Sequence, residues 1–177
     1  MSAAAAEPLL RESLDISRRA LGPDDPDVST HLLNLATVLL DNRQYPAAEQ
    51  ALEEALVRRR RQLGPRHWQV ANTMTYLAEV KRATGRAREA QALAAEAVDI
   101  LAAALPSTHW RTAQARSVLG DCLVALGDLE TAGPLLTESA AVLRAAQGSG
   151  GYPARRARER LQRYEAARRT TAAATFR

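Results

Sequence analysis

Apolar residues recur along this chain at the spacing of amphipathic helices. The first clear run is Val28, Leu32, Leu35 and Leu39. These positions are three or four residues apart, so they fall on one face of an α-helix. A similar run follows over residues 48–56, after the short breaker "DNRQY", and "ATGRA" and "ALGDL" separate later runs in the same way. Two helical runs joined by a short breaker predict a pair of antiparallel helices with a tight turn.

The pattern repeats with a period of 42 residues. The phrases "LGPDDP", "LGPRHW", "LPSTHW" and "QGSGGY" begin at residues 21, 63, 105 and 147. A spacing held over three intervals indicates an internal repeat, which predicts stacked copies of one helix pair. The residues that coincide in this register are Leu35, Leu77, Leu119 and Leu161, and the small residues Ala48, Ala90 and Ala132. A small residue at one fixed site of each repeat predicts close contact between helices there.

Each repeated phrase is interpreted as the joint between one helix pair and the next. Asp25 stands before Pro26 as the N-cap and first-turn proline of a new helix. The His-Trp pairs at 67–68 and 109–110 occupy the same place in the next two repeats. A shared metal or catalytic site is disfavoured because they lie one whole helix pair apart, and we interpret them as structural residues at a helix start. The glycines predicted to end the preceding helices are Gly22, Gly64 and Gly148.

The register divides the chain into a solenoid with a single helix at each end. Residues 3–20 have the phase of a second helix without its partner, and residues 153–168 have the phase of a capping first helix. Complete pairs are predicted over residues 27–62, 69–104 and 111–146. We expect residues 1–168 to form one all-α, right-handed solenoid of about seven helices. Residues 169–177 are expected to be a disordered tail.

Composition agrees with a soluble helical protein. The 177 residues are 46% apolar and 25% charged, with few aromatic residues. The first residues lack the basic start and apolar run of a signal peptide, and no apolar stretch is long enough to span a membrane. We therefore expect a cytoplasmic protein without membrane contact.

Positive charge is concentrated in two segments. Residues 151–177 contain eight Arg against two Glu, and "RRRR" occupies residues 58–61. Such segments can attract nucleic acid, but no aromatic stacking residues are interleaved with the arginines. We interpret both as solvated helix surface, and keep nucleic-acid binding through the Arg-rich last helix as an alternative.

No set of residues predicts catalysis or a cofactor. Cys122 is the only cysteine, so neither an intrachain disulfide nor a cysteine cluster can form, and its register predicts a buried thiol. The glycine cluster at 148–151 is not followed by the Lys-Ser/Thr of a phosphate-binding loop. Because no nucleophile, base and orienting group can be assembled, we predict a protein that is not an enzyme.

The aligned positions resemble the tetratricopeptide repeat. In the first full repeat, the family's Leu, small residue, Ala, large apolar residue and Ala correspond to Leu35, Ala36, Ala48, Leu52 and Ala55. The 42-residue period and the phrases "ALGPDDPDVSTHLLNLA" and "YPAAEQALEEAL" are similar to the longer repeats of kinesin light chains. Residues 109–146 resemble the C-terminal repeat arrays of some bacterial serine/threonine protein kinases, although the kinase motifs are absent. The preference for Arg over Lys, 23 to 1, would suit a GC-rich bacterial genome.

The resemblance implies a non-catalytic module that binds a peptide or helix of a partner protein, possibly as the regulatory part of a bacterial signalling protein. In the family, the first helix of each pair lines a concave groove. The positions that face a peptide carry over to Thr30, Leu33, Asn34, Thr37, Asn72, Thr75, Tyr76, Glu79, Gln114, Ser117, Asp121, Arg156, Glu159 and Arg163. The Lys and Asn pattern of chaperone-binding relatives is missing, so neither their ligand nor that of kinesin light chains is predicted. A structural, self-associating role is the second hypothesis, because the unpaired end helices expose faces that neighbouring repeats normally cover.

Overall fold

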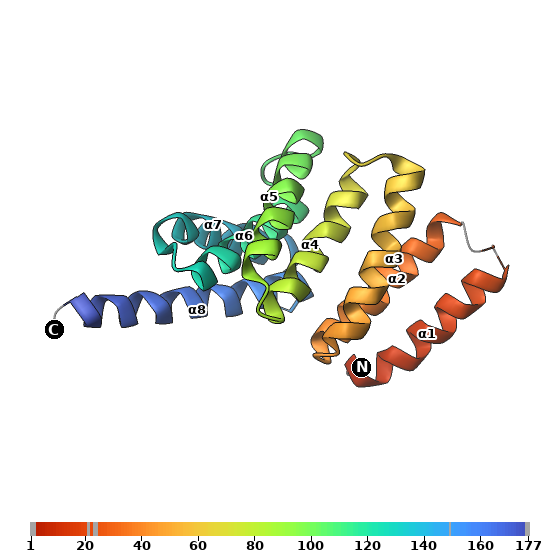
Figure 1. Cartoon of the computed structure of the whole chain (residues 1–177), viewed down its shortest axis with the longest axis horizontal. Helices are drawn as coiled ribbons and strands as arrows, with labels where there is room; N and C mark the ends of the chain where they lie inside the picture. Colours follow the sequence, from red (N-terminus) through yellow and green to blue (C-terminus); the bar gives the residue numbers. More distant parts are fainter. Residues whose placement is uncertain (1–2, 21, 23–24, 149, 176–177) are drawn as a thin grey trace.

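The structure is a computed structural model that describes residues 3–20, 22, 25–148 and 150–175. These residues form helices and contain no strand (Figure 1). The helices are α1 (Ala3–Ala20), α2 (Pro26–Asp41), α3 (Tyr45–Leu63), α4 (Trp68–Ala83), α5 (Ala87–Ala104), α6 (Trp110–Leu126), α7 (Leu129–Gln147) and α8 (Tyr152–Thr175). Consecutive helices pack against each other, and α4 and α6 also contact the first helices on either side of them. The predicted all-α solenoid of helix pairs is confirmed.

Two expectations are corrected. The described part of the chain has eight helices, not seven, because the three pairs are flanked by two single helices, α1 and α8. Residues 169–175 were expected in a disordered tail, but they continue α8 as far as Thr175. No glycine or proline occurs between residues 154 and 175, so nothing in the sequence ends the helix earlier. Residues 176–177 lie outside the described residues.

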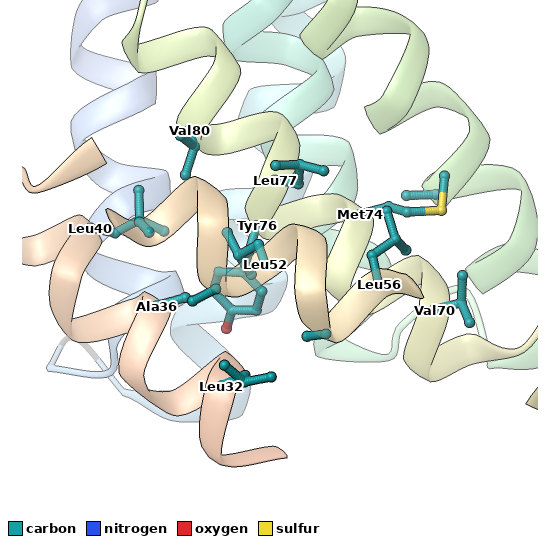
Figure 2. Close-up of a cluster of buried hydrophobic side chains, with 14 of the residues drawn as sticks. Leu32, Ala36, Leu40, Leu52, Leu56, Val70, Met74, Tyr76, Leu77 and Val80 are labelled. Carbon is teal, nitrogen blue, oxygen red and sulfur yellow. The ribbon is translucent and has the colours of Figure 1, made fainter. Parts of the chain in front are cut away.

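The apolar core lies between the helices of each pair and between neighbouring pairs. Leu52 of α3 is fully buried, and Leu32 of α2 and Leu77 of α4 are nearly so. Figure 2 shows this region, where side chains of α2, α3 and α4 come together. Ala48, Ala90 and Ala132 are all completely buried, as expected for close helix contact. At Gly120, a Cβ atom would lie only 2.7 Å from Cγ of Leu136, so α6 and α7 approach each other too closely there for a side chain.

The joints between pairs are built as the sequence predicts. Asp25 caps α2, since its carboxylate accepts a hydrogen bond from the backbone N of Asp27 at 2.8 Å. The backbone φ is +87° at Gly22, +82° at Gly64 and +64° at Gly148, values that favour glycine.

The two His-Trp pairs are confirmed as structural residues at helix starts. Nδ1 of His67 accepts a hydrogen bond from the backbone N of Gln69 at 3.2 Å, and Nδ1 of His109 accepts one from the backbone N of Arg111 at 3.1 Å. The guanidinium of Arg111 lies 4.7 Å from the ring centre of Trp68 and 4.2 Å from that of Trp110. The two indoles therefore hold one cation between successive joints.

None of the helices described between residues 3 and 175 is both long and apolar enough to cross a lipid bilayer.

Candidate functional site

The last helix reaches well beyond its neighbours in the solenoid. α8 packs against α7 and α6, as a further first helix would. In Figure 1 it runs across the direction of α4 and α5, and its first residues lie near α4. Its long side chains also contact α4 and α2, through the ion pairs Arg156–Glu79 and Arg155–Asp41. The beginning of α8 therefore meets all three of the other first helices.

Glu79 of α4 is the centre of these contacts. Its Oε1 lies 2.7 Å from Nε of Arg156 and 2.7 Å from Nη2 of Arg160, and it accepts a hydrogen bond from the hydroxyl of Tyr152 at 3.1 Å. The side chains of Glu79 and Arg160 are only 3% and 2% exposed. Burial raises the pKa of Glu79, but the guanidiniums of Arg160 and Arg156 outweigh burial and hold that pKa below its usual 4.5. Glu79 is therefore a buried carboxylate anion at neutral pH.

Two further carboxylates complete the arrangement. Oδ1 of Asp121 on α6 lies 3.0 Å from a guanidinium nitrogen of Arg163, and its Oδ2 lies 3.3 Å from Nε of Arg82. Asp41, at the end of α2, accepts hydrogen bonds at 2.7 Å on both carboxylate oxygens from Nη2 of Arg155. We call the set Asp41, Glu79, Asp121, Arg155, Arg156, Arg160 and Arg163 the inner ionic layer. In it, α8 supplies four cations to carboxylates from α2, α4 and α6.

An open cleft of about 450 Å³ lies along this layer. It is bounded by the ends of α2 and α4, by the beginning of α3 and by α8. Among the residues that line it are five of the predicted groove positions: Glu79, Asp121, Arg156, Glu159 and Arg163. The structure thus brings predicted residues from α4, α6 and α8 to one surface.

The remaining predicted residues divide into two groups. On α2, Thr30 and Asn34 are exposed, while Leu33 and Thr37 are half-buried. The buried group on α4 and α6 comprises Asn72, Thr75, Tyr76, Gln114 and Ser117. Side chains of α8 contact two of these: the ring of Tyr152 is centred 6.1 Å from that of Tyr76, and Nη1 of Arg160 donates to the hydroxyl of Ser117 at 3.4 Å. In this structure a ligand can reach the first group without rearrangement, but not the second.

Sequence reasoning missed several residues of the cleft. Asp41, Arg43, Tyr45, Arg82 and Arg155 also line it. One signal was available, because the inner positions of α4 and α6 carry carboxylates while the last helix is rich in arginine. That opposition of charge indicates contact between the two, but the repeat pattern alone does not say how far along the solenoid α8 reaches.

Comparison with known proteins identifies the family. A profile of the tetratricopeptide repeat matches residues 2–56, 27–103 and 69–145. The chain belongs to the tetratricopeptide repeat family. Repeats of this family mediate protein–protein interaction, and its members are generally non-catalytic scaffolds. A search of curated proteins finds no match.

Solved structures with the same fold include proteins of the kinesin light chain kind. A crystal structure of a putative kinesin light chain from Podosopora anserina, with nearly identical repeats similar to tetratricopeptide repeats, aligns with a TM-score of 0.70 at 23% identity, covering 98% of this chain and 82% of that chain. A variant of the same protein aligns with a TM-score of 0.69 at 23% identity and the same coverage. BtubC (BKLC) from P. vanneervenii aligns with a TM-score of 0.67 at 22% identity, covering 82% of this chain and 58% of that chain. At these identities the likeness shows the fold.

The one thiol of this tetratricopeptide repeat chain is unreactive. Cys122 is completely buried, and burial, with the nearby carboxylate of Asp121, raises its pKa to about 12. A thiol with that pKa stays protonated at neutral pH and is a poor nucleophile. Burial and the guanidinium of Arg111 lower the pKa of His109, so its Nδ1 remains an acceptor for the helix cap at neutral pH. Within the ranges that the structure describes, no three His, Cys, Asp or Glu side chains are grouped to hold a metal ion.

Proposed function

We propose that this chain is a non-catalytic interaction module that binds an extended segment of a partner protein in the cleft beside the inner ionic layer. The observation that carries the proposal is the convergence of five predicted groove residues, from α4, α6 and α8, on that one open cleft. Its family supplies the general role, and the cleft supplies a place of suitable size and polarity.

The chemistry of the cleft favours a partner segment with charged side chains. Arg43 and Glu159 offer opposite charges on its lining. The ion pair of Arg155 with Asp41 is partly exposed, with side chains 40% and 26% accessible. Exposed ion pairs are worth little, so a partner's carboxylate or guanidinium can replace one member at small cost.

The exposed residues of α2 extend this surface. Asn34 has both a donor and an acceptor on its amide, and Thr30 has a hydroxyl, so each can bond the backbone of an extended peptide. Leu33 adds a half-buried apolar contact. In this proposal the buried residues Asn72 and Tyr76 support the cleft from beneath and do not touch the partner.

Affinity capture from the source cells tests the proposal. The bait proteins are the wild-type chain, Arg43→Glu and Asn34→Ala, with Arg88→Glu as a control that makes the same charge reversal at an exposed site on α5. We expect a partner that is retained by wild type and Arg88→Glu and is lost or reduced with Arg43→Glu and Asn34→Ala. Equal capture by all four, with equal thermal midpoints, would show that this cleft is not the binding surface.

The cellular setting belongs to the same proposal. A cytoplasmic role as the regulatory part of a bacterial signalling protein is supported by the sequence resemblance described above. Nucleic-acid binding through α8 has weaker support, because Arg155, Arg156, Arg160 and Arg163 already pair with carboxylates. Salt-dependent retention of RNA or DNA that is lost on removing residues 155–177 would favour it instead.

A further inference from the structure

The two ends of the solenoid are complementary halves of one helix pair. In the 42-residue register α1 corresponds to the second helices α3, α5 and α7, whereas α8 corresponds to the first helices α2, α4 and α6. Both α3 and α5 pack between two first helices, but α1 packs against α2 alone. α1 therefore lacks the first helix of its own pair.

The missing neighbour leaves apolar side chains uncovered. Ile16 is 52% exposed, whereas Ile100, at the same register position on α5, is 2% exposed. Leu9 is 56% exposed, whereas Ala51, at the same position on α3, is 7% exposed. Leu9, Glu12 and Ile16 are spaced three and four residues apart, so they share one face of α1. This face is the one that a first helix covers in a complete pair.

The other end lacks a second helix. The first helices α2, α4 and α6 end after 16, 16 and 17 residues, but α8 continues for 24 residues and does not turn back within the described chain. A cavity of about 320 Å³ lies between α7 and α8. Its lining is mainly small or apolar, with two arginines: Thr137, Ala140, Ala141, Arg144, Ala154, Arg158 and Leu161.

We propose that α1 of a second copy of this chain packs into the cavity between α7 and α8 and completes a fourth helix pair. The proposal does not depend on partner binding in the cleft, because it uses the opposite ends of the solenoid. α1 and the far end of α8 lie at opposite ends of the molecule (Figure 1), so one chain cannot make this contact with itself. Copies then associate head to tail.

Charge complementarity selects a second copy as the occupant. Glu12 has the same register position as Glu138 of α7, and Arg158 has that of Arg116 of α6. Glu138 and Arg116 line one cavity between α6 and α7. If α1 of a second copy takes the place of a second helix beside α8, the same register puts its Glu12 opposite Arg158. The apolar residues Leu9 and Ile16 then lose their exposure.

The contact joins two different surfaces, so it does not close on itself. A heterologous contact of this kind produces open-ended chains of molecules unless its rotation closes a ring. The size of the assembly should therefore increase continuously with protein concentration.

Sedimentation velocity of the full chain, from low micromolar to near-millimolar concentration, tests the proposal. The wild type should show a weight-average mass that rises with concentration beyond that of a dimer. Glu12→Arg and Arg158→Glu should each weaken association at least about tenfold, which corresponds to a loss of about 1.4 kcal/mol. Arg88→Glu, an exposed charge reversal on α5, should leave association unchanged.

A mixture of the two variants provides the decisive arm. A junction between one variant and the other joins either the two natural residues or the two substituted ones, and in both cases opposite charges meet. An equimolar mixture of Glu12→Arg and Arg158→Glu should therefore regain the association that each variant alone loses. Circular dichroism should show equal thermal midpoints, since both residues are on the end surfaces. A wild type that stays monomeric, a mass that stops at a dimer, or a mixture that fails to associate would overturn the proposal.

Discussion

The two sides of α4 are buried by different means. On one side Met74, Leu77 and Val80 pack into the apolar core with α2, α3 and α5. On the other side Glu79 meets Arg156 and Arg160 of α8 in the inner ionic layer. A helix that is buried all round is usually hydrophobic all round, yet α4 is not. The comparison teaches that burial of a repeat helix depends on what its neighbour carries, and that only the apolar side can be recognised from the helix's own sequence.

Removing the carboxylate at the centre of the ionic layer should have the largest effect. In Glu79→Ala, the 2% exposed side chain of Arg160 loses its anion, and we expect the free energy of unfolding to fall by about 3–5 kcal/mol. Denaturant unfolding measures the change. Glu96→Ala removes an exposed carboxylate from α5 as a control, and its effect should stay within about 0.5 kcal/mol. Similar small losses in both variants would mean that the ionic layer adds nothing to stability.

Acid unfolding examines the same carboxylate independently. The pKa of Glu79 is held below 4.5 in the folded chain, so below 4.5 the unfolded chain binds more protons at this residue. Glu79 therefore contributes stability that is present above that pH and is lost as pH falls through the folded pKa. We expect Glu79→Gln to lose less further stability than wild type between neutral pH and the acid range. Parallel stability curves for the two proteins would contradict the assignment.

The apolar side should respond to a cavity. Leu52 is completely buried between α2 and α4, and Leu52→Ala should lower the free energy of unfolding by about 2–5 kcal/mol. Val57→Ala, at a side chain 69% exposed on the same helix, should change it by less than about 0.5 kcal/mol. Because no charge is involved at Leu52, its loss should be the same at neutral and acid pH, in contrast to that of Glu79.

Close helix contact in the apolar layer should make larger side chains unfavourable. Ala90 is completely buried at the position shared by Ala48 and Ala132. We expect Ala90→Leu to overpack the contact between α4 and α5, at a cost of about 1–3 kcal/mol. Ala102→Leu makes the same change at an exposed position of α5. Equal thermal midpoints for the two variants would refute the register of the repeat.

The sequence predicts the apolar half of this molecule well and the ionic half poorly. Helical periodicity and the 42-residue register identify the pairs, the joints and the burial of Cys122, because each depends on local spacing. The register also assigns Asn72, Tyr76 and Gln114 to the inner surface, but it cannot show that a later helix covers that surface. The pairing of Glu79 with Arg160 joins residues far apart in the chain, and the length of α8 depends on the absence of a terminating residue. Both need the three-dimensional arrangement.

The outermost ion pair of the layer should contribute least. Arg155 and Asp41 have the same chemistry as Arg160 and Glu79, but their side chains are 40% and 26% exposed. Water and salt screen such a pair, so Arg155→Ala should cost about 0–1 kcal/mol, and raising the ionic strength should reduce that cost further. Denaturant unfolding at low and high salt, with Glu79→Ala alongside, measures both effects. If burial decides the strength of these pairs, the cost of Arg155→Ala falls with salt while that of Glu79→Ala changes little; a loss at Arg155 as large as that at Glu79 would show that burial does not decide it.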